Sequence, residues 1–131
     1  MIRTNLLSSL TLLFPFFAHA SQILSCRFPD GLSADRIRVT LLDSQNGSFL
    51  YETADPAGTG STEALKLKRT QDPEPGTAAF EIQNAAVQMT FKIETALLFQ
   101  TGNKLPASLL SRIPEMDLSQ EQPLSCDSVV K

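Results

Sequence analysis

The stretch "TAAFEIQNAAVQMTFKIE", residues 77–94, alternates apolar and polar side chains on both sides of a short break. The apolar positions that repeat every second residue are Ala78, Phe80, Ile82, Val87, Met89, Phe91 and Ile93. A period of two is typical of strands that turn one face to a core and the other to water. The stretch therefore predicts an antiparallel hairpin with a turn at residues 84–86, in which Glu81 opposes Met89 or Thr90.

Similar alternation covers most of the chain on either side of this hairpin. It is visible in "RIRVTLLD" (36–43), "FLYET" (49–53), "EALKLKRTQ" (63–71) and "LSCDSVV" (124–130). Between these segments, the pair Asn46-Gly47 is a strong signal for a hairpin turn, and residues 54–62 and 72–76 are rich in Gly and Pro. About eight short strands separated by turns predict an all-β domain, a small antiparallel sandwich or barrel.

One segment, residues 105–119, does not alternate. Its apolar residues Leu109, Leu110, Ile113 and Met116 share a helical face. Pro106 suits the first turn of a helix and Pro114 limits its length. We predict one short helix or irregular cap near 106–113. It either covers an open end of the barrel, which we favour, or presents its apolar side chains to a partner.

The N-terminus has the features of a secretory signal. Arg3 precedes an apolar run that is too short to cross a bilayer, which takes ~20 residues of helix. Behind the run, Ala18 and Ala20 form the small-residue pattern that precedes a signal cleavage site. We predict a cleavable signal peptide over residues 1–20, a single β domain over residues 21–131, and export to the periplasm or beyond the cell. An N-terminal core helix is the alternative interpretation.

A second cleavage site, directly before Cys26, would attach a lipid to that cysteine. Leu24 is bulky where such sites usually have a small residue, and Ser21-Gln22 separates the site from the apolar run. We therefore favour the cut after Ala20, with a lipid-anchored envelope protein as the alternative.

The chain has two cysteines, Cys26 and Cys126, each five residues from an end of the predicted mature chain. In an oxidising compartment such a pair is expected to form a disulfide. Alternation puts Cys26 on the same face as Leu24, and Cys126 on the same face as Leu124. We predict a disulfide that joins two neighbouring terminal strands and closes the sheet; two buried free thiols are the alternative.

The expected mature chain has few of the groups that catalysis needs. The only histidine, His19, lies in the predicted signal peptide, so mechanisms and zinc sites that use imidazole are excluded. Glu81 and Glu94 lie too far apart along the predicted hairpin to act as a glycosidase pair. We expect no enzyme and no cofactor or metal. Loss of Arg3 changes the net charge from −3 to −4, which argues against nucleic acid as a partner.

Basic residues provide one candidate binding surface. The cations on two predicted strands are Arg36, Arg38, Lys66, Lys68 and Arg69. If the two strands were adjacent, their outward side chains would form a patch for an anionic glycan, a lipid headgroup or an acidic protein. Ordinary solvent-facing positions are the alternative interpretation, because edge lysines also discourage aggregation.

In general plan, the predicted domain resembles the compact β-barrel lysozyme inhibitors that bacteria export, which are also short, disulfide-braced and made with a signal peptide. The resemblance implies a small secreted or periplasmic, non-catalytic domain that acts as a binding or interaction module, with a protein or envelope glycan as partner. An inhibitor of this kind would use exposed loops such as 54–62 or 72–76. The alternative is an accessory or structural envelope protein, lipid-tethered through Cys26.

Overall fold

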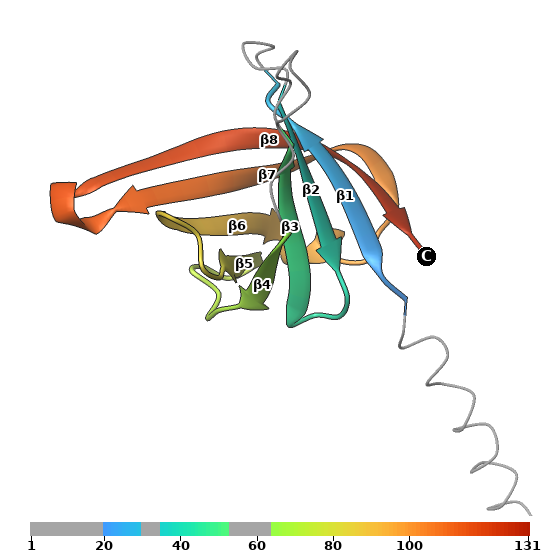
Figure 1. Cartoon of the computed structure of the whole chain (residues 1–131). Helices are drawn as coiled ribbons and strands as arrows, with labels where there is room; N and C mark the ends of the chain where they lie inside the picture. Colours follow the sequence, from blue (N-terminus) through green and yellow to red (C-terminus); the bar gives the residue numbers. More distant parts are fainter. Residues whose placement is uncertain (1–19, 30–34, 53–63) are drawn as a thin grey trace, which may run out of the picture.

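A computed structural model of the chain describes residues 20–29, 35–52 and 64–131, which form a closed antiparallel β-barrel (Figure 1). Each strand pairs with the next in chain order and the last closes on the first. The strands are β1 (Gln22–Arg27), β2 (Arg36–Leu41), β3 (Asn46–Glu52), β4 (Leu65–Arg69), β5 (Thr77–Ile82), β6 (Gln88–Glu94), β7 (Gly102–Ile113) and β8 (Leu118–Val130). Two 3-10 turns, η1 (Thr95–Leu97) and η2 (Pro114–Met116), complete the described secondary structure. The predicted all-β class is confirmed.

Some of the predicted features lie outside the described residues. The expected signal peptide falls there up to residue 19, including Ala18, and so does the loop 54–62. Ala20 is described, and it directly precedes the first pair of the barrel, in which Ser21 and Lys131 exchange backbone hydrogen bonds of 2.9 Å.

The hairpin over residues 77–94 has the predicted pairing. Phe80 lies opposite Phe91, and Glu81 lies opposite Thr90. Both phenylalanines are completely buried and contribute to a core built from the inward residues of all eight strands. Burial of a Phe side chain stabilises the fold by about 1.5–3 kcal/mol, so alternation in this hairpin supplies a large part of the core energy.

The predicted disulfide is confirmed. Cys26 and Cys126 are directly opposite each other in the β1–β8 pair, with their Cα atoms 4.0 Å apart. Leu24 and Leu124 are buried on the same faces as the cysteines, as their alternation predicted. The bridge therefore joins the strands that close the barrel, across a sequence separation of 100.

The prediction of a short helix or cap near 106–113 is wrong. These residues belong to β7, which pairs with β6 on one side and β8 on the other. Pro106 is tolerated because its missing N–H faces β6 one position beyond their last pair, Ile93–Ala107. Hydrogen bonds to two neighbouring strands outweigh the helical spacing of the apolar residues. As a consequence, Leu109 is buried whereas Leu110 is on the outer face.

The turn between β2 and β3 also differs from the prediction. Asn46 and Gly47 are the first residues of β3, and the chain reverses at residues 42–45. The carboxylate of Asp43 accepts hydrogen bonds from the backbone N–H groups of Gln45 (2.7 Å) and Asn46 (2.8 Å) and holds the turn. These bonds lower the pKa of Asp43. Gly47 is required by close packing, because a Cβ there would collide with the Thr40 carbonyl oxygen.

The β7–β8 hairpin extends past the barrel as a long projection (Figure 1). β1 ends at Arg27, opposite Ser125, whereas β8 begins at Leu118. We call residues 110–122, the outer part of this hairpin, the arm. At its tip, Asp117 has a φ of 51° and returns the chain from η2 into β8.

Candidate functional site

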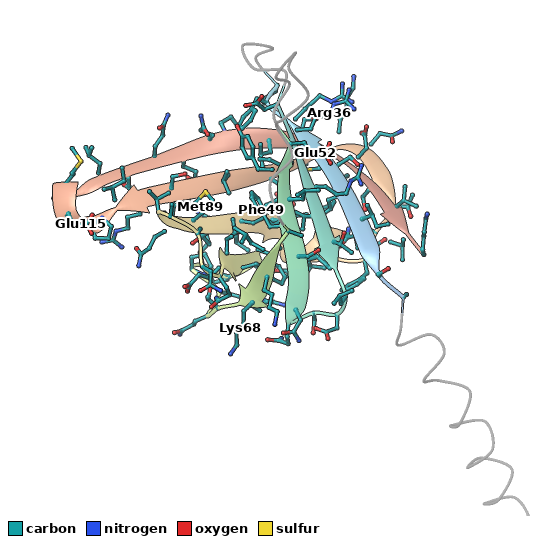
Figure 2. The ribbon with its side chains drawn as sticks, in the orientation of Figure 1. Arg36, Phe49, Glu52, Lys68, Met89 and Glu115 are labelled. Carbon is teal, nitrogen blue, oxygen red and sulfur yellow. A yellow bond between two sulfur atoms is a disulfide. The ribbon has the colours of Figure 1, made fainter. Side chains whose placement is uncertain are left out.

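The two ends of the barrel are filled differently. The closed end is where β1 begins, β8 ends and the segment 95–100 connects β6 to β7. The arm end is where β1 and β3 end, where the β5–β6 turn lies and from which the arm projects. Met89 lies opposite Ser111 of the arm, and Figure 2 shows Glu115 at the arm's far tip.

Gln22 organises the closed end. Its side chain is fully buried, and its Nε2 donates hydrogen bonds to the carbonyl oxygens of Leu97 (3.0 Å) and Gln100 (3.3 Å) and to Ser128 Oγ (2.9 Å). Its Oε1 accepts a hydrogen bond of 2.8 Å from the Phe99 N–H. The segment 95–100 therefore folds across the barrel end as a plug that is hydrogen-bonded to the side chains of Gln22 and Ser128.

Arg69 covers another part of the closed end. Its guanidinium lies 5.8 Å from the ring centre of Phe80 and donates to Asp72 and to the Ser44 carbonyl oxygen. Only 14% of its side chain is exposed. A guanidinium that lies over an aromatic ring and has its hydrogen-bond donors satisfied covers the edge of the core favourably. Arg69 therefore stabilises the barrel rather than joining an outward surface.

The arm end contains an apolar hollow of about 380 Å³. It is lined by Phe49, Tyr51, Leu65, Asn84, Ala85, Ala86 and Met89. The hydroxyl of Tyr51 donates a hydrogen bond of 2.8 Å to Asp35 at the rim. Partial burial, together with the nearby carboxylate, raises the pKa of Tyr51 to about 12, so the phenol is neutral at physiological pH. A mostly apolar hollow with a few polar groups is typical of a binding site.

Large apolar side chains are exposed near the same end. Met116 (64% exposed) and Leu118 (53%) are at the arm tip, and Val87 (37%) is in the β5–β6 turn. A second hollow, of about 350 Å³, lies between this turn and residues 112–115 of the arm. The arm end thus has two hollows, both of which are lined in part by the β5–β6 turn. It also has exposed apolar side chains.

The outer wall carries a shallow groove of about 400 Å³, lined by both polar and apolar side chains, across β6, β7 and β8. In it, Lys92 Nζ lies 2.6 Å from Glu121 Oε1, which also accepts a hydrogen bond of 3.1 Å from Ser108. The bonds from Lys92 and Ser108 lower the pKa of Glu121. The carboxylate of Glu121 is therefore ionised and paired with Lys92, which suits a structural contact better than proton transfer.

The structure does not bring the basic residues together. β3 lies between β2 and β4, so Arg36 and Arg38 are separated from Lys66 and Lys68. Figure 2 shows Arg36 and Lys68 at opposite ends of the barrel. Arg38 lies 3.8 Å from Glu52, and Arg69 belongs to the closed end. A role for these cations in binding stays a prediction.

Metal and membrane features can be stated for the described ranges. Within residues 20–29, 35–52 and 64–131, no group of three or more His, Cys, Asp or Glu side chains could hold a metal ion. No helix in these ranges is long and apolar enough to span a bilayer. Comparison with protein-family models, curated proteins and solved structures found no match to this chain.

Sequence analysis did not identify the residues that distinguish the two ends. Gln22 looked like part of a polar spacer after the signal peptide, and Met116 looked like one residue of a helical face. The polar Gln22 within the alternating run 22–27 was a usable signal, because it shares a face with Leu24 and Cys26. The hollow left no signal, since its lining comes from four separate strands and turns.

Proposed function

We propose that this chain is an exported, non-catalytic β-barrel that binds another protein through its arm end. The observation that carries the proposal is that the apolar hollow and the exposed side chains of Val87, Met116 and Leu118 all lie at the arm end of the barrel. Exposed apolar surface together with a hollow typically marks an interaction site. The opposite end exposes Leu42 and Val129 but is closed by buried hydrogen bonds at Gln22.

A protein partner fits this surface better than a glycan. Sugars are recognised through many hydrogen bonds, whereas the hollow at Phe49 and Met89 presents carbon-rich side chains. Exposed Met and Leu at the end of a projecting hairpin are suited to insertion into a complementary apolar pocket, where burial of each contributes about 1.5–3 kcal/mol. An inhibitor-like mode, in which the arm occupies a cleft of an enzyme, is consistent with the resemblance in general plan.

The position of β1 supports a freely exported chain over a lipid-tethered one. Cleavage directly before Cys26 would remove residues 22–25, which form most of β1 and include the completely buried Gln22 and Leu24. It would also consume the thiol that bonds to Cys126. Cleavage after Ala20 retains the whole strand and the disulfide.

A site-specific photo-crosslinking experiment in the native host tests the proposal. A photoreactive amino acid replaces Met116 in one strain and Leu42, which is 57% exposed near the closed end, in the control strain. We expect a discrete crosslinked protein from position 116 and none from position 42. Equal adducts from both positions, or none from either, would contradict binding through the arm end.

The inhibitor-like mode has its own test. The purified protein is titrated against a muralytic enzyme, and residual activity is measured. A stoichiometric end point that is lost in Met116→Asp but retained in Leu42→Asp would support this mode. Full enzyme activity at excess protein would exclude muralytic enzymes of that type and leave the crosslinked protein as the partner to identify.

A further inference from the structure

The outer part of β8 has one unpaired edge. β8 pairs with β7 along Leu118–Pro123, but on its other side β1 pairs with it only from Ser125 onward. Among the described residues, no strand pairs with this second side of residues 118–123. Figure 1 shows β8 as the outer strand along the length of the arm.

The direction of the backbone groups on this edge follows from the barrel pairing. Ser21 and Lys131 exchange N–H and C=O hydrogen bonds, so alternate residues of β8, counted back from Lys131, face the β1 side. Among residues 118–123 these are Pro123, Glu121 and Ser119. The N–H groups of Ser119 and Glu121 therefore point away from β7, whereas Gln120 and Gln122 direct theirs to β7.

This edge is complementary to itself. When two copies of β8 run antiparallel with Gln120 opposite Gln120, Ser119 of each copy lies opposite Glu121 of the other. The two residues can then exchange backbone hydrogen bonds, and no like charges are directly opposed. Pro123, which has no N–H, falls opposite Asp117 at the end of the strand and limits the pairing to this segment.

Charge also matches in this alignment. Arg27, the last residue of β1, is directly opposite Arg36, the first residue of β2, and both are exposed. The tip of the second copy, with Glu115 and Asp117, would come to within about 7 Å of Arg27, which is two strand positions from the end of the pairing. The guanidinium groups of Arg27 and Arg36 would then face two carboxylates of the second copy. Arg27 also lies 3.7 Å from Asp127 of its own chain.

We propose that two copies of this chain associate through the edges of β8, forming a two-fold symmetric dimer whose pairing centres on Gln120. The contact uses backbone groups of Ser119 and Glu121, neither of which lines the apolar hollow. It therefore goes beyond the proposed binding function, and either one can hold without the other.

Cysteine crosslinking tests the alignment directly. In the proposed dimer Gln120 faces its own copy at a non-hydrogen-bonded position, where Cα atoms are about 4.5 Å apart and a disulfide can form. Gln122, on the same face of the same strand, would be about 13 Å from its copy. In the exported protein, Gln120→Cys should oxidise to a covalent dimer and Gln122→Cys should stay monomeric. Equal crosslinking of both variants would overturn the proposal.

A second measurement distinguishes lost pairing from lost folding. Ser119→Pro removes an N–H that β7 does not use, so the barrel should keep its melting temperature. In sedimentation equilibrium, the dissociation constant of the dimer should rise about tenfold or more, while Ser119→Ala should leave it unchanged. The proposed dimer would be contradicted if the wild-type protein were monomeric at its highest soluble concentration. It would also be contradicted if Gln120→Cys formed its crosslink with a different protein.

Discussion

The closed end and the arm end of this barrel are filled in different ways. At the closed end, one buried amide, Gln22, satisfies several backbone groups of the plug 95–100. At the arm end, a hollow of about 380 Å³ stays lined with apolar side chains. The first arrangement satisfies buried polar groups within the chain, whereas the second leaves apolar surface that another molecule can cover.

The largest effect is expected at the closed end. Gln22→Leu keeps the size of the side chain but leaves the Phe99 N–H and the Leu97 carbonyl without their partner. Buried unsatisfied groups cost about 1–3 kcal/mol each, so the free energy of unfolding should fall by about 3 kcal/mol. Urea unfolding of the variant measures this loss.

The exposed Gln88 on β6 provides the matched control, because Gln88→Leu changes no buried hydrogen bond and should alter stability by less than about 0.5 kcal/mol. If both variants lost the same stability, the amide of Gln22 would have no special role, and the contrast between the ends would fail.

A smaller effect on stability is expected at the arm end. Ala85→Leu adds apolar atoms at the edge of the existing hollow, where the lining has room to accept them. The free energy of unfolding should change by less than about 1 kcal/mol, whereas crosslinking through position 116 should fall strongly. A large stability loss with unchanged crosslinking would show that the hollow is tightly packed in solution.

The smallest effect concerns pH. Tyr51 is the only tyrosine, so the ultraviolet absorbance of tyrosinate reports its ionisation directly. Its pKa is raised from 10.0 to about 12 in the folded protein, mainly by burial and then by Asp35. Its contribution to stability is therefore complete below pH 10 and is lost as the pH rises from 10 to about 12.

The Asp35→Asn variant sharpens this measurement, because it removes the carboxylate while leaving the burial of Tyr51. The midpoint of the titration should move down toward 10. A midpoint at the ordinary value in the unaltered protein would show that the rim at Tyr51 is open to water, and that the hollow is less defined than its geometry indicates.

Much of the barrel was predictable because strand alternation is local. The burial of Phe80 and Phe91, the pairing of Glu81 with Thr90, and the joining of Cys26 to Cys126 were predicted from spacing and confirmed. Val87, predicted on the same apolar face, is instead exposed in the turn before β6. The turn before β3 was not, because Asp43 captures backbone N–H groups earlier than the Asn46-Gly47 signal indicated. The hollow and the plug combine residues that are far apart in the chain.

The sequence by itself determined the all-β class, the residues that face the core and the bond between the terminal strands, because a two-residue period and a cysteine pair carry that information locally. Only the tertiary structure decided that residues 105–113 form a strand, that one barrel end is sealed by Gln22 and that the other is hollow. These features depend on hydrogen-bond partners and packing surfaces supplied by distant segments, and such partners outweigh local preference.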